Sequence, residues 1–445
     1  GRADFDIRKD DMRLIGKNVV IYGAGASGIS AYGLAREKGA KAIVYDDDEN
    51  ARGATHSKSV FDGADLVVLS PGVDGGKDFL LDARLENVQV ISELALASAY
   101  CDAEQIAVTG TNGKTTTTLL INAVLTRAGL HAHALGNIGT PFSSIADKLD
   151  ATEIAVVEAS SFQLENSAEF SPDIAVILNV EPDHLSRHKT MRNYQNAKAN
   201  IFRYQSESDK LVYNADDERV CEMVEEAISE KIPFSTKKVV PNGAYISSGF
   251  ACYKGQPIVA LEDVDFAGDE LQNVLATVAV CMEKGISAFC TASAITDFAK
   301  PKYRRTLSAI VNGVKIYNDS KATNVSSCKS ALGCVCECAL ILGGQLGSED
   351  FDPFFENLPS NVKYIATVGE NADEILHSAR KVGYKDIDRY GDLQSALDGA
   401  YDEAVKRCAD TVLFSPASKS FDEYESYAER GKKFDECVVK LRLSK

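Results

Sequence analysis

Short runs of apolar, often β-branched residues alternate along the chain with stretches of helical character. This alternation is typical of parallel sheets whose strands are joined by crossover helices. The pattern occurs in three blocks, with buried strands predicted at residues 18–22, 42–45, 66–69 and 88–91, then at 105–109, 154–158 and 174–180, and finally at 338–342, 364–368 and 411–415. A hairpin-like segment over 244–261 and two helices complete the second block.

Three such blocks in 445 residues predict an α/β protein of three domains, because a domain typically has about 100–200 residues. We expect the domains to cover residues 1–98, 99–301 and 302–445. No Pro- or Ser-rich linker marks the boundaries between them.

Lys and Arg number 48 against 65 Asp and Glu, which gives a net charge of −17. This acidic excess opposes non-specific binding to nucleic acid or to an anionic membrane. No apolar run is long enough to span a bilayer, and no charged leader with an apolar stretch opens the chain. Eleven cysteines without a small disulfide framework fit a reducing compartment. We therefore expect a cytoplasmic protein that has no membrane span and no nucleic-acid partner.

A glycine-rich loop follows the predicted strand at 105–109 and precedes a helix expected to begin near Thr115. Its residues are Gly110, Thr111, Asn112, Gly113, Lys114, Thr115 and Thr116. Backbone N–H groups and a helix N-terminus in this context surround a polyphosphate, Lys114 adds a mobile positive charge, and the Thr115 hydroxyl can bind Mg²⁺. Val108 stands where the strict motif has glycine, so an ordinary strand–helix turn is the alternative. The loop predicts a nucleotide site in a P-loop ATPase-like central domain.

Gly23, Gly25 and Gly28 form a second glycine loop, with the spacing of a dinucleotide-binding fingerprint. Asp46 lies where an acidic residue would meet a ribose. The loop predicts a Rossmann-like N-terminal domain, and the third block predicts a Rossmann-like C-terminal domain. Taken alone, the loop would favour a nicotinamide dehydrogenase or a tight turn without a ligand. Two phosphate-type loops in successive domains instead suggest two different phosphorylated ligands.

Three ionisable side chains of the central domain are candidates for metal binding or acid–base chemistry. Glu158 ends an apolar strand, where a carboxylate beside a phosphate loop is well placed to bind Mg²⁺. His184 follows the next strand, and Lys198 lies in a helical stretch over 194–202. The alternatives are a solvated acid, a structural histidine and a surface lysine, and position alone does not decide between them.

Several motifs, in order over most of the chain, resemble the Mur ligases, which are ATP-dependent amide-forming enzymes of peptidoglycan synthesis. The matching segments are residues 109–115, 136–139, 158–164, 179–184, 214–217 and 318–324. Within this family, the last segment and residues 415–422 resemble the branch that adds D-glutamate.

The resemblance implies an enzyme that joins D-glutamate to UDP-N-acetylmuramoyl-L-alanine through an acyl phosphate formed with ATP. Lys114 and Mg²⁺ would neutralise charge during phosphoryl transfer. Thr115 and Glu158 would hold one Mg²⁺, and His184 with a carbamylated Lys198 would hold a second. A partly buried lysine with a lowered pKa can take up CO₂ in this way. The implied catalytic residues are Lys114, His184 and Lys198.

The resemblance also implies where the ligands bind, and it carries the expectation of a monomer. ATP would contact residues 110–116 together with Asn273, Arg304 and Asp319. The nucleotide-sugar substrate would contact Gly23, Gly25, Ser27, Gly28, Asp46, Gly72, Asn137, Ser160 and Gln163. D-Glutamate would contact Lys321, Thr323, Ser420, Phe421 and Tyr427.

Three positions depart from the common family pattern. Tyr303 stands where a histidine often precedes Arg304, residues 345–348 lack the usual lysine, and residues 46–48 are all acidic where a basic residue often follows the first acid. The missing lysine bears on the amino acid more than on ATP. A Mur- or folylpolyglutamate-type ligase for another amino acid therefore stays open, as does a nucleotide-driven conformational switch without amide formation.

Cys334, Cys336 and Cys338 lack the paired spacing of a metal knuckle. We expect them to share one face of a strand as small buried thiols.

Overall fold

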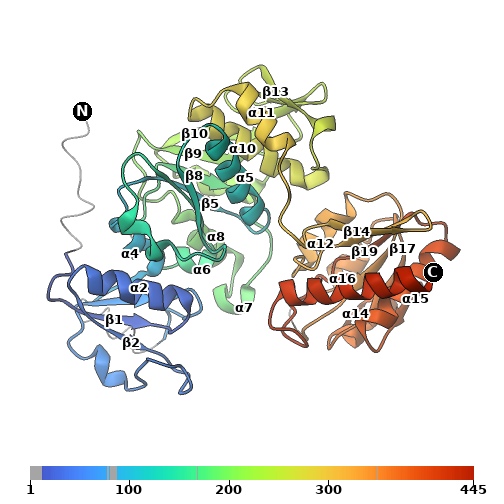
Figure 1. The fold of residues 1–445 in the computed structure, drawn as a ribbon, viewed down its shortest axis with the longest axis horizontal. Helices are drawn as coiled ribbons and strands as arrows, with labels where there is room; N and C mark the ends of the chain where they lie inside the picture. The colour runs from blue at the N-terminus through green and yellow to red at the C-terminus, as the bar shows by residue number, and fades with distance from the viewer. Residues whose placement is uncertain (1–12, 78–79, 81–87, 168, 348) are drawn as a thin grey trace. The chain divides into compact units, whose positions relative to one another are not determined.

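The computed structural model describes residues 13–77, 80, 88–167, 169–347 and 349–445. The chain forms two compact units (Figure 1). One comprises the residues up to Asp265 together with Leu271–Phe298, and the other comprises Phe266–Glu270 together with Ala299–Lys445. The described residues form three sheets, two in the first unit and one in the second. The predicted α/β class is confirmed, whereas the domain boundaries at 98/99 and 301/302 stay predictions.

The first sheet has four parallel strands in the order β2-β1-β3-β4. The strands are β1 Asn18–Tyr22, β2 Lys41–Tyr45, β3 Leu66–Leu69 and β4 Gln89–Ser92, and the helices are α2 Ala26–Glu37, η1 Lys58–Phe61 and α4 Glu93–Ala99. All four residues of β3 are buried, as expected for a parallel strand covered on both faces. Helix α2 packs on this sheet (Figure 1).

The second sheet has nine strands in the order β13-β12-β11-β10-β9-β8-β5-β7-β6. Its strands are β5 Glu104–Thr109, β6 Ala132–Gly136, β7 Ile154–Glu158, β8 Ile174–Ile177, β9 Lys210–Asn214, β10 Glu230–Ser235, β11 Ala244–Ser247, β12 Phe250–Tyr253 and β13 Gln256–Ala260. The strands from β11 to β6 run parallel, and β12 and β13 add antiparallel partners at one edge. The predicted phosphate loop therefore lies at the carboxyl end of β5, a strand in the interior of this sheet.

Helices surround this second sheet (Figure 1). They are α5 Lys114–Arg127, η2 Phe142–Ser144, η3 Ala146–Lys148, α6 Ser161–Leu164, α7 Leu185–His188, α8 Met191–Ala199, α9 Glu218–Val224, η4 Leu261–Asp263, α10 Leu271–Glu283 and α11 Ala288–Thr296. Helix α5 packs against α10 and α11.

The second unit is built on a six-stranded sheet in the order β14-β15-β19-β16-β17-β18, parallel except for the β14–β15 pair. Its strands are β14 Thr306–Val311, β15 Val314–Asn318, β16 Cys338–Leu342, β17 Val362–Thr367, β18 Ile387–Arg389 and β19 Thr411–Phe414. Its helices are η5 Gly268–Glu270, α12 Val325–Leu332, α13 Asp352–Glu356, α14 Ala372–Lys381, α15 Leu393–Lys406 and α16 Tyr427–Ser444. Helices α15 and α16 pack together beside it (Figure 1).

Some predicted elements need correction. The strand expected over 174–180 ends at Ile177, because the chain turns to place Asn179 against the glycine-rich loop. The thiol prediction is wrong for two of three cysteines: Cys338 is buried in β16, but Cys334 and Cys336 precede the strand and Cys336 is exposed.

The sequence prediction also missed strands, among them the β14–β15 hairpin. Leu307 and Ile310 on β14 are exposed, so this edge strand does not read as a buried apolar run. The signal that could have found the hairpin is Asn312-Gly313, both of which have positive φ, between two valines.

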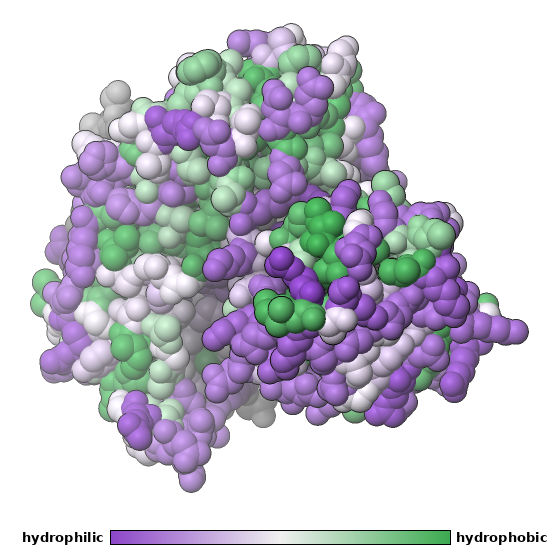
Figure 2. Space-filling model, turned by 45° about the vertical axis from the view of Figure 1, so that its right-hand side comes forward, coloured by the Kyte–Doolittle hydropathy of each residue, from purple (hydrophilic) through white to green (hydrophobic). Residues whose placement is uncertain are grey.

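The surface is largely hydrophilic in the view of Figure 2, in keeping with the acidic composition. Among the described residues, no helix combines the length and the apolar character that a membrane crossing requires.

Candidate active site

The glycine-rich loop lies between β5 and α5, as predicted. Gly113 has a φ of +85° at the start of α5. Asn179 holds the loop through two bonds, because its carbonyl accepts the Thr111 N–H at 2.9 Å and its side-chain Oδ1 accepts the Asn112 N–H at 2.8 Å. Lys114 Nζ donates to the Gly110 and Thr111 carbonyls, both at 2.8 Å. The ammonium group thus lies against the loop, whose backbone N–H groups are the type of donor that binds phosphate oxygens.

Asn273, at the start of α10, lies directly beside this loop. Its Oδ1 accepts the Thr117 hydroxyl proton at 3.2 Å. A Cβ atom added at Gly113 would approach the same oxygen to 2.2 Å. The structure therefore brings Asn273 from a sequence distance of 160 positions to the residues predicted to bind ATP.

Glu158 ends β7 and is 2 % exposed. Its Oε1 accepts the Asn137 side-chain N–H at 2.9 Å, whereas its Oε2 is buried and has no hydrogen-bond partner among the described residues. An unpartnered carboxylate oxygen in a buried position is costly unless a cation completes it. This oxygen therefore fits the Mg²⁺ expected at Glu158, and the Thr115 hydroxyl as a further ligand stays a prediction.

Lys198 lies on α8 with 1 % of its surface exposed, so the surface-lysine alternative is wrong. Its Nζ donates to the Gly110 carbonyl at 2.7 Å and lies 4.6 Å from the centre of the Tyr194 ring. Burial, together with the charge of Lys114, lowers the pKa of Lys198 well below its usual value, while Asp183 and Glu158 oppose the shift. The four groups lie close enough to interact electrostatically.

His184 has a left-handed backbone (φ +55°) and caps the N-terminus of α7. Its Nδ1 lies 3.6 Å from Asp183 Oδ1, and its ring centre lies 4.9 Å from that of Phe162. About a third of its side chain is exposed, so the imidazole is accessible to a ligand.

Ser160 and Gln163, predicted to bind substrate, also have a local structural task. The Ser160 hydroxyl accepts the Gln163 N–H at 3.3 Å, and Gln163 Oε1 accepts the Ser160 N–H at 2.9 Å. This reciprocal cap starts the short helix α6. Their contact with substrate stays a prediction.

The first glycine loop is braced from two sides. Ser70 Oγ donates to the Gly23 carbonyl at 3.1 Å, and Asp46 Oδ2 accepts the Ala24 N–H at 2.7 Å. Gly28 approaches this turn so closely that a Cβ would lie 1.8 Å from the Gly23 oxygen. Gly25 and Gly72 are exposed and Ser27 is half-buried, which leaves their backbone and hydroxyl groups accessible.

The acidic run after β2 receives a cation that the sequence analysis missed. Asp47 forms an ion pair with Lys77 and accepts hydrogen bonds from Tyr22 and Tyr45. Burial raises the pKa of Asp47, but these bonds outweigh it and lower the pKa to about 2. Lys77 is distant in sequence, so no local signal announces the pairing.

In the second unit, Asp319 is fully buried at the end of β15. Its carboxylate accepts the Arg305 N–H at 3.0 Å and the Ser415 hydroxyl proton at 2.8 Å. Burial raises the pKa of Asp319 to about 6, against the charge of Arg304. Arg304 itself keeps a buried Nε without a hydrogen-bond partner in the described chain.

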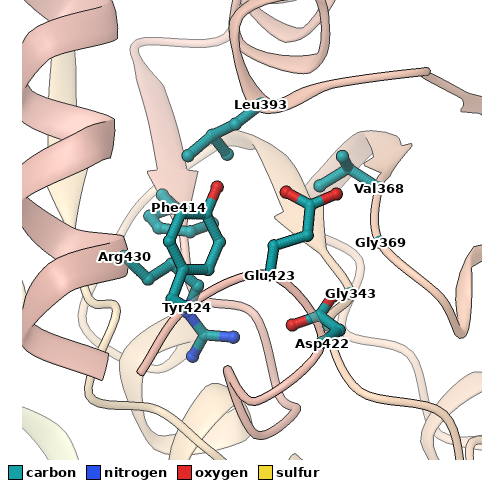
Figure 3. Close-up of a pocket in the computed structure, with 10 residues that line it drawn as sticks. Gly343, Val368, Gly369, Leu393, Phe414, Asp422, Glu423, Tyr424 and Arg430 are labelled. Carbon is teal, nitrogen blue, oxygen red and sulfur yellow. The ribbon is translucent and has the colours of Figure 1, made fainter. Parts of the chain in front are cut away.

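The residues predicted for D-glutamate come from two loops and the first residue of α16, all in the second unit. Lys321 Nζ lies 5.4 Å from the centre of the Tyr427 ring. Ser420 is buried, Thr323 is half-buried, and Phe421 is exposed. None of these five lines the open pocket of Figure 3, which lies between Gly343, Gly369 and the side chains of Asp422, Glu423 and Arg430.

Arg430 is a buried cation that sequence reasoning did not single out. Its guanidinium donates to the Ser418 carbonyl at 2.9 Å, to the Lys419 carbonyl at 3.3 Å and to both oxygens of Ser320, at 2.8 and 3.1 Å. It thereby ties the loop after β15 to the loop after β19. Ser348, in the segment without the usual lysine, lies outside the described residues.

Comparison with known proteins gives a consistent match. A family model described as the Mur ligase middle domain matches residues 108–281. A UDP-N-acetylmuramoylalanine–D-glutamate ligase of Alkaliphilus oremlandii is 35% identical over 455 residues, covering 97% of this chain and 100% of the relative. The protein of the same name from Bacillus subtilis (strain 168) is 33% identical over 456 residues, covering 98% and 100%.

Solved structures are similar in fold at low identity. The MurF ligase of Thermotoga maritima, crystallised with ADP, has a TM-score of 0.59 at 17% identity and covers 97% of this chain and 99% of its own. The UDP-N-acetylmuramate-alanine ligase of the same organism has a TM-score of 0.58 at 18% identity, covering 96% and 99%.

Proposed function

We propose a function from one premise: this chain belongs to the Mur ligase family, and within it to the UDP-N-acetylmuramoylalanine–D-glutamate ligases. It is an ATP-dependent ligase that adds D-glutamate to UDP-N-acetylmuramoyl-L-alanine in peptidoglycan synthesis. The observation that carries this conclusion is similarity over the full length of both chains, which includes the ATP loop and the second unit alike.

The chemistry follows from the poor reactivity of a carboxylate towards an amine. ATP phosphorylates the carboxylate of the nucleotide substrate, the amine of D-glutamate attacks the acyl phosphate, and phosphate leaves from a tetrahedral intermediate. Backbone N–H groups of residues 110–116 would hold the phosphates, and Lys114 would neutralise the charge that develops on them. Asn273 beside Gly113 would contact the adenine, with Arg304 and Asp319 as further ATP contacts.

Mg²⁺, when bound, would screen the phosphate charges during transfer. Thr115 and Glu158 would hold one ion through the hydroxyl and the unpartnered Oε2, and His184 with Lys198 would hold a second. The described residues contain no cluster of three or more His, Cys, Asp or Glu that could bind a metal by itself. The sites therefore depend on hydroxyl, carbamate and ligand oxygens as well.

Carbamylation of Lys198 would turn a repelling cation into an anionic ligand. The low pKa of Lys198 supports it, because only the neutral amine reacts with CO₂. We expect Lys198→Ala to lose activity and short carboxylic acids to restore part of it. An intact-protein mass that rises with bicarbonate in the wild type, but not in Lys198→Ala, would add a readout that does not depend on turnover. No rescue and no mass change would contradict the carbamate.

For the other substrates, the exposed Gly25 and Gly72 and the half-buried Ser27 support the nucleotide-sugar site at Gly23, Gly25, Ser27, Gly28, Asp46, Gly72 and Asn137. Ser160 and Gln163 would add contacts, and Lys321, Thr323, Ser420, Phe421 and Tyr427 would bind D-glutamate.

The described cysteines form no disulfide, which supports a reducing compartment. We propose a monomer, which size-exclusion chromatography with light scattering tests.

The deciding experiment measures phosphate release from ATP with UDP-N-acetylmuramoyl-L-alanine and Mg²⁺, adding one amino acid at a time. Release stimulated by D-glutamate, with an amide product by mass, is the expected result. The segment Gln345-Leu346-Gly347 lacks the usual lysine, so an amino acid other than D-glutamate is the second candidate. Stimulation by that amino acid alone would change the substrate and keep the mechanism. No phosphate release with any amino acid would favour a nucleotide-driven conformational switch without amide formation.

A further inference from the structure

Arg187 lies on α7, three residues after His184, and neither the sequence analysis nor the proposed function gives it a task. Its side chain is only 14% exposed. It reaches away from its own helix to the loop that follows β3, at residues 70–73. There its Nη1 donates to the Pro71 carbonyl at 3.3 Å and to the Gly72 carbonyl at 3.5 Å, and its Nη2 donates to the Val73 carbonyl at 2.6 Å.

A second set of contacts fixes the guanidinium itself. Glu165 Oε2 accepts from Nη2 at 2.6 Å and from Nε at 3.1 Å, and both are charge-assisted bonds. The guanidinium also lies 4.5 Å from the centre of the Phe162 ring. His188 Nδ1 lies 3.2 Å from the other Glu165 oxygen, and its Nε2 lies 3.0 Å from Ser161 Oγ. His188 therefore also fixes the position of the Glu165 carboxylate.

The loop that Arg187 grips also supports the first glycine loop. Ser70 donates to the Gly23 carbonyl, and the Val73 N–H donates to the Ser70 carbonyl. A continuous set of contacts thus runs from the glycine loop through residues 70–73 to one guanidinium, and from there to α7, the helix whose N-cap residue is His184. Loop carbonyls held by a fixed cation keep one conformation, whereas an unheld exposed loop samples several.

We propose that Arg187 is a positioning residue for the nucleotide-sugar substrate. It fixes the loop at residues 70–73, which carries Gly72, relative to the helix that carries His184. His184 and the loop that carries Gly72 are thereby held at a fixed distance from each other within the first unit. This inference rests on the proposed function, since Gly72 and His184 matter to a ligand only if both sites are used.

The test compares Arg187→Gln, Arg187→Lys and Glu165→Gln with Arg127→Gln. Arg127 is the control, because it is also an arginine of the first unit that pairs with a carboxylate, that of Asp297, but it does not contact residues 70–73. Calorimetry measures binding of UDP-N-acetylmuramoyl-L-alanine and, separately, of a non-hydrolysable ATP analogue. We expect Arg187→Gln to raise the Kd and KM of the nucleotide sugar at least about tenfold, the effect of losing hydrogen bonds to a charged group. ATP-analogue binding should not change.

Arg187→Lys keeps the charge but loses the planar fork, so we expect it to fall between wild type and Arg187→Gln. Glu165→Gln should weaken nucleotide-sugar binding in the same direction. Hydrogen exchange adds a readout without ligand: amides of residues 70–76 should exchange faster in Arg187→Gln, while those of β5 should not. This arm also covers a variant that binds nothing because it is misfolded, since β5 would then lose protection too.

Unchanged nucleotide-sugar binding, or equal weakening of both ligands, would overturn the inference while leaving the ligase function intact. A wild-type protein that binds ATP but neither binds the nucleotide sugar nor releases phosphate would instead overturn the proposed function.

Discussion

The ionisation of the buried Asp319 should change the free energy of unfolding with pH, in a direction that can be measured. Its pKa is raised from 3.8 to about 6 by burial, so the folded chain holds this proton more tightly than the unfolded chain does. The stability that Asp319 contributes is therefore full below pH 3.8 and is lost as the pH rises to about 6. Compared with Asp319→Asn, the wild type should lose up to about 3 kcal/mol of unfolding free energy across this window.

Urea unfolding at several pH values tests this, with Asp352→Asn as a control of opposite sign. Asp352 is half-buried, and hydrogen bonds from Lys381 and Ser378 lower its pKa, so its contribution to stability grows as the pH rises. Parallel curves for wild type and Asp319→Asn would contradict the assignment.

Gly113 and Gly129 allow the space beside the ATP loop to be tested separately from backbone strain. Both have a φ near +85°, but a Cβ at 113 would meet Asn273 Oδ1 at 2.2 Å and one at 129 would meet nothing within 4 Å. Alanine at either position should cost about 1 kcal/mol of stability. Only Gly113→Ala should displace Asn273 and raise the Kd of an ATP analogue at least about tenfold. Similar Kd values for both variants would show that the contact has no role in binding.

At the level of single side chains, the sequence predicted those residues whose structure depends on their neighbours along the chain. Gly110, Gly113 and Lys114 form a loop whose shape depends on neighbours along the chain. Arg187, Arg430 and Lys77 were missed because their partners lie far away in sequence, and a lone basic residue carries no mark of what it will contact. The carbamate assignment of Lys198 came from family resemblance, and burial supplies a physical reason for it only once the fold is known.

Among the secondary-structure elements, the loops after β15 and β19 depend on one helix residue. Arg430, on α16, is the donor for carbonyls of both loops, and burial lowers its pKa only to about 10, so it stays charged at neutral pH. Arg430→Met should cost about 3 kcal/mol or more of unfolding free energy, because buried carbonyls lose their donor. D-Glutamate should also bind more weakly, since Ser420 belongs to one of these loops.

Arg407→Met is the comparison, since Arg407 lies at the surface and pairs with Glu403 and Asp386. This substitution should cost about 1 kcal/mol or less of unfolding free energy. Equal losses in urea unfolding would mean that the Arg430 bonds hold no more than an ordinary surface pair.

Elements buried on both faces were the ones that sequence pattern located best. β1, β3, β7 and β16 have the predicted bounds, and β5 agrees within one residue. The half-exposed strands β14 and β18 escaped, because their apolar residues alternate with polar ones or are too few to form a run. Strand order in each sheet was not predictable in the same way, since it depends on which strands meet rather than on where they are.

Over the whole molecule, the proposed ligands divide between the two compact units. The ATP loop and Asn273 belong to the first unit, and the predicted D-glutamate residues belong to the second. In hydrogen exchange, an ATP analogue alone should slow amides at 110–117. Slowing at 418–421 should require D-glutamate and the nucleotide sugar, because this loop is proposed to hold the amino acid. β18 serves as an internal control. Protection of 418–421 by the ATP analogue alone would contradict this division.

The antiparallel edge of the nine-stranded sheet has a consequence for behaviour at high concentration. Its outermost strand, β13, carries the exposed Pro257, which has no N–H to donate, and the β12–β13 register shifts between Ala251 and Cys252. A neighbouring copy that approached this edge would meet a strand that has one backbone donor fewer and an irregular register. Edge-to-edge polymerisation is thus opposed where the sheet would otherwise offer a template, and replacing Pro257 with a β-branched residue would remove that protection.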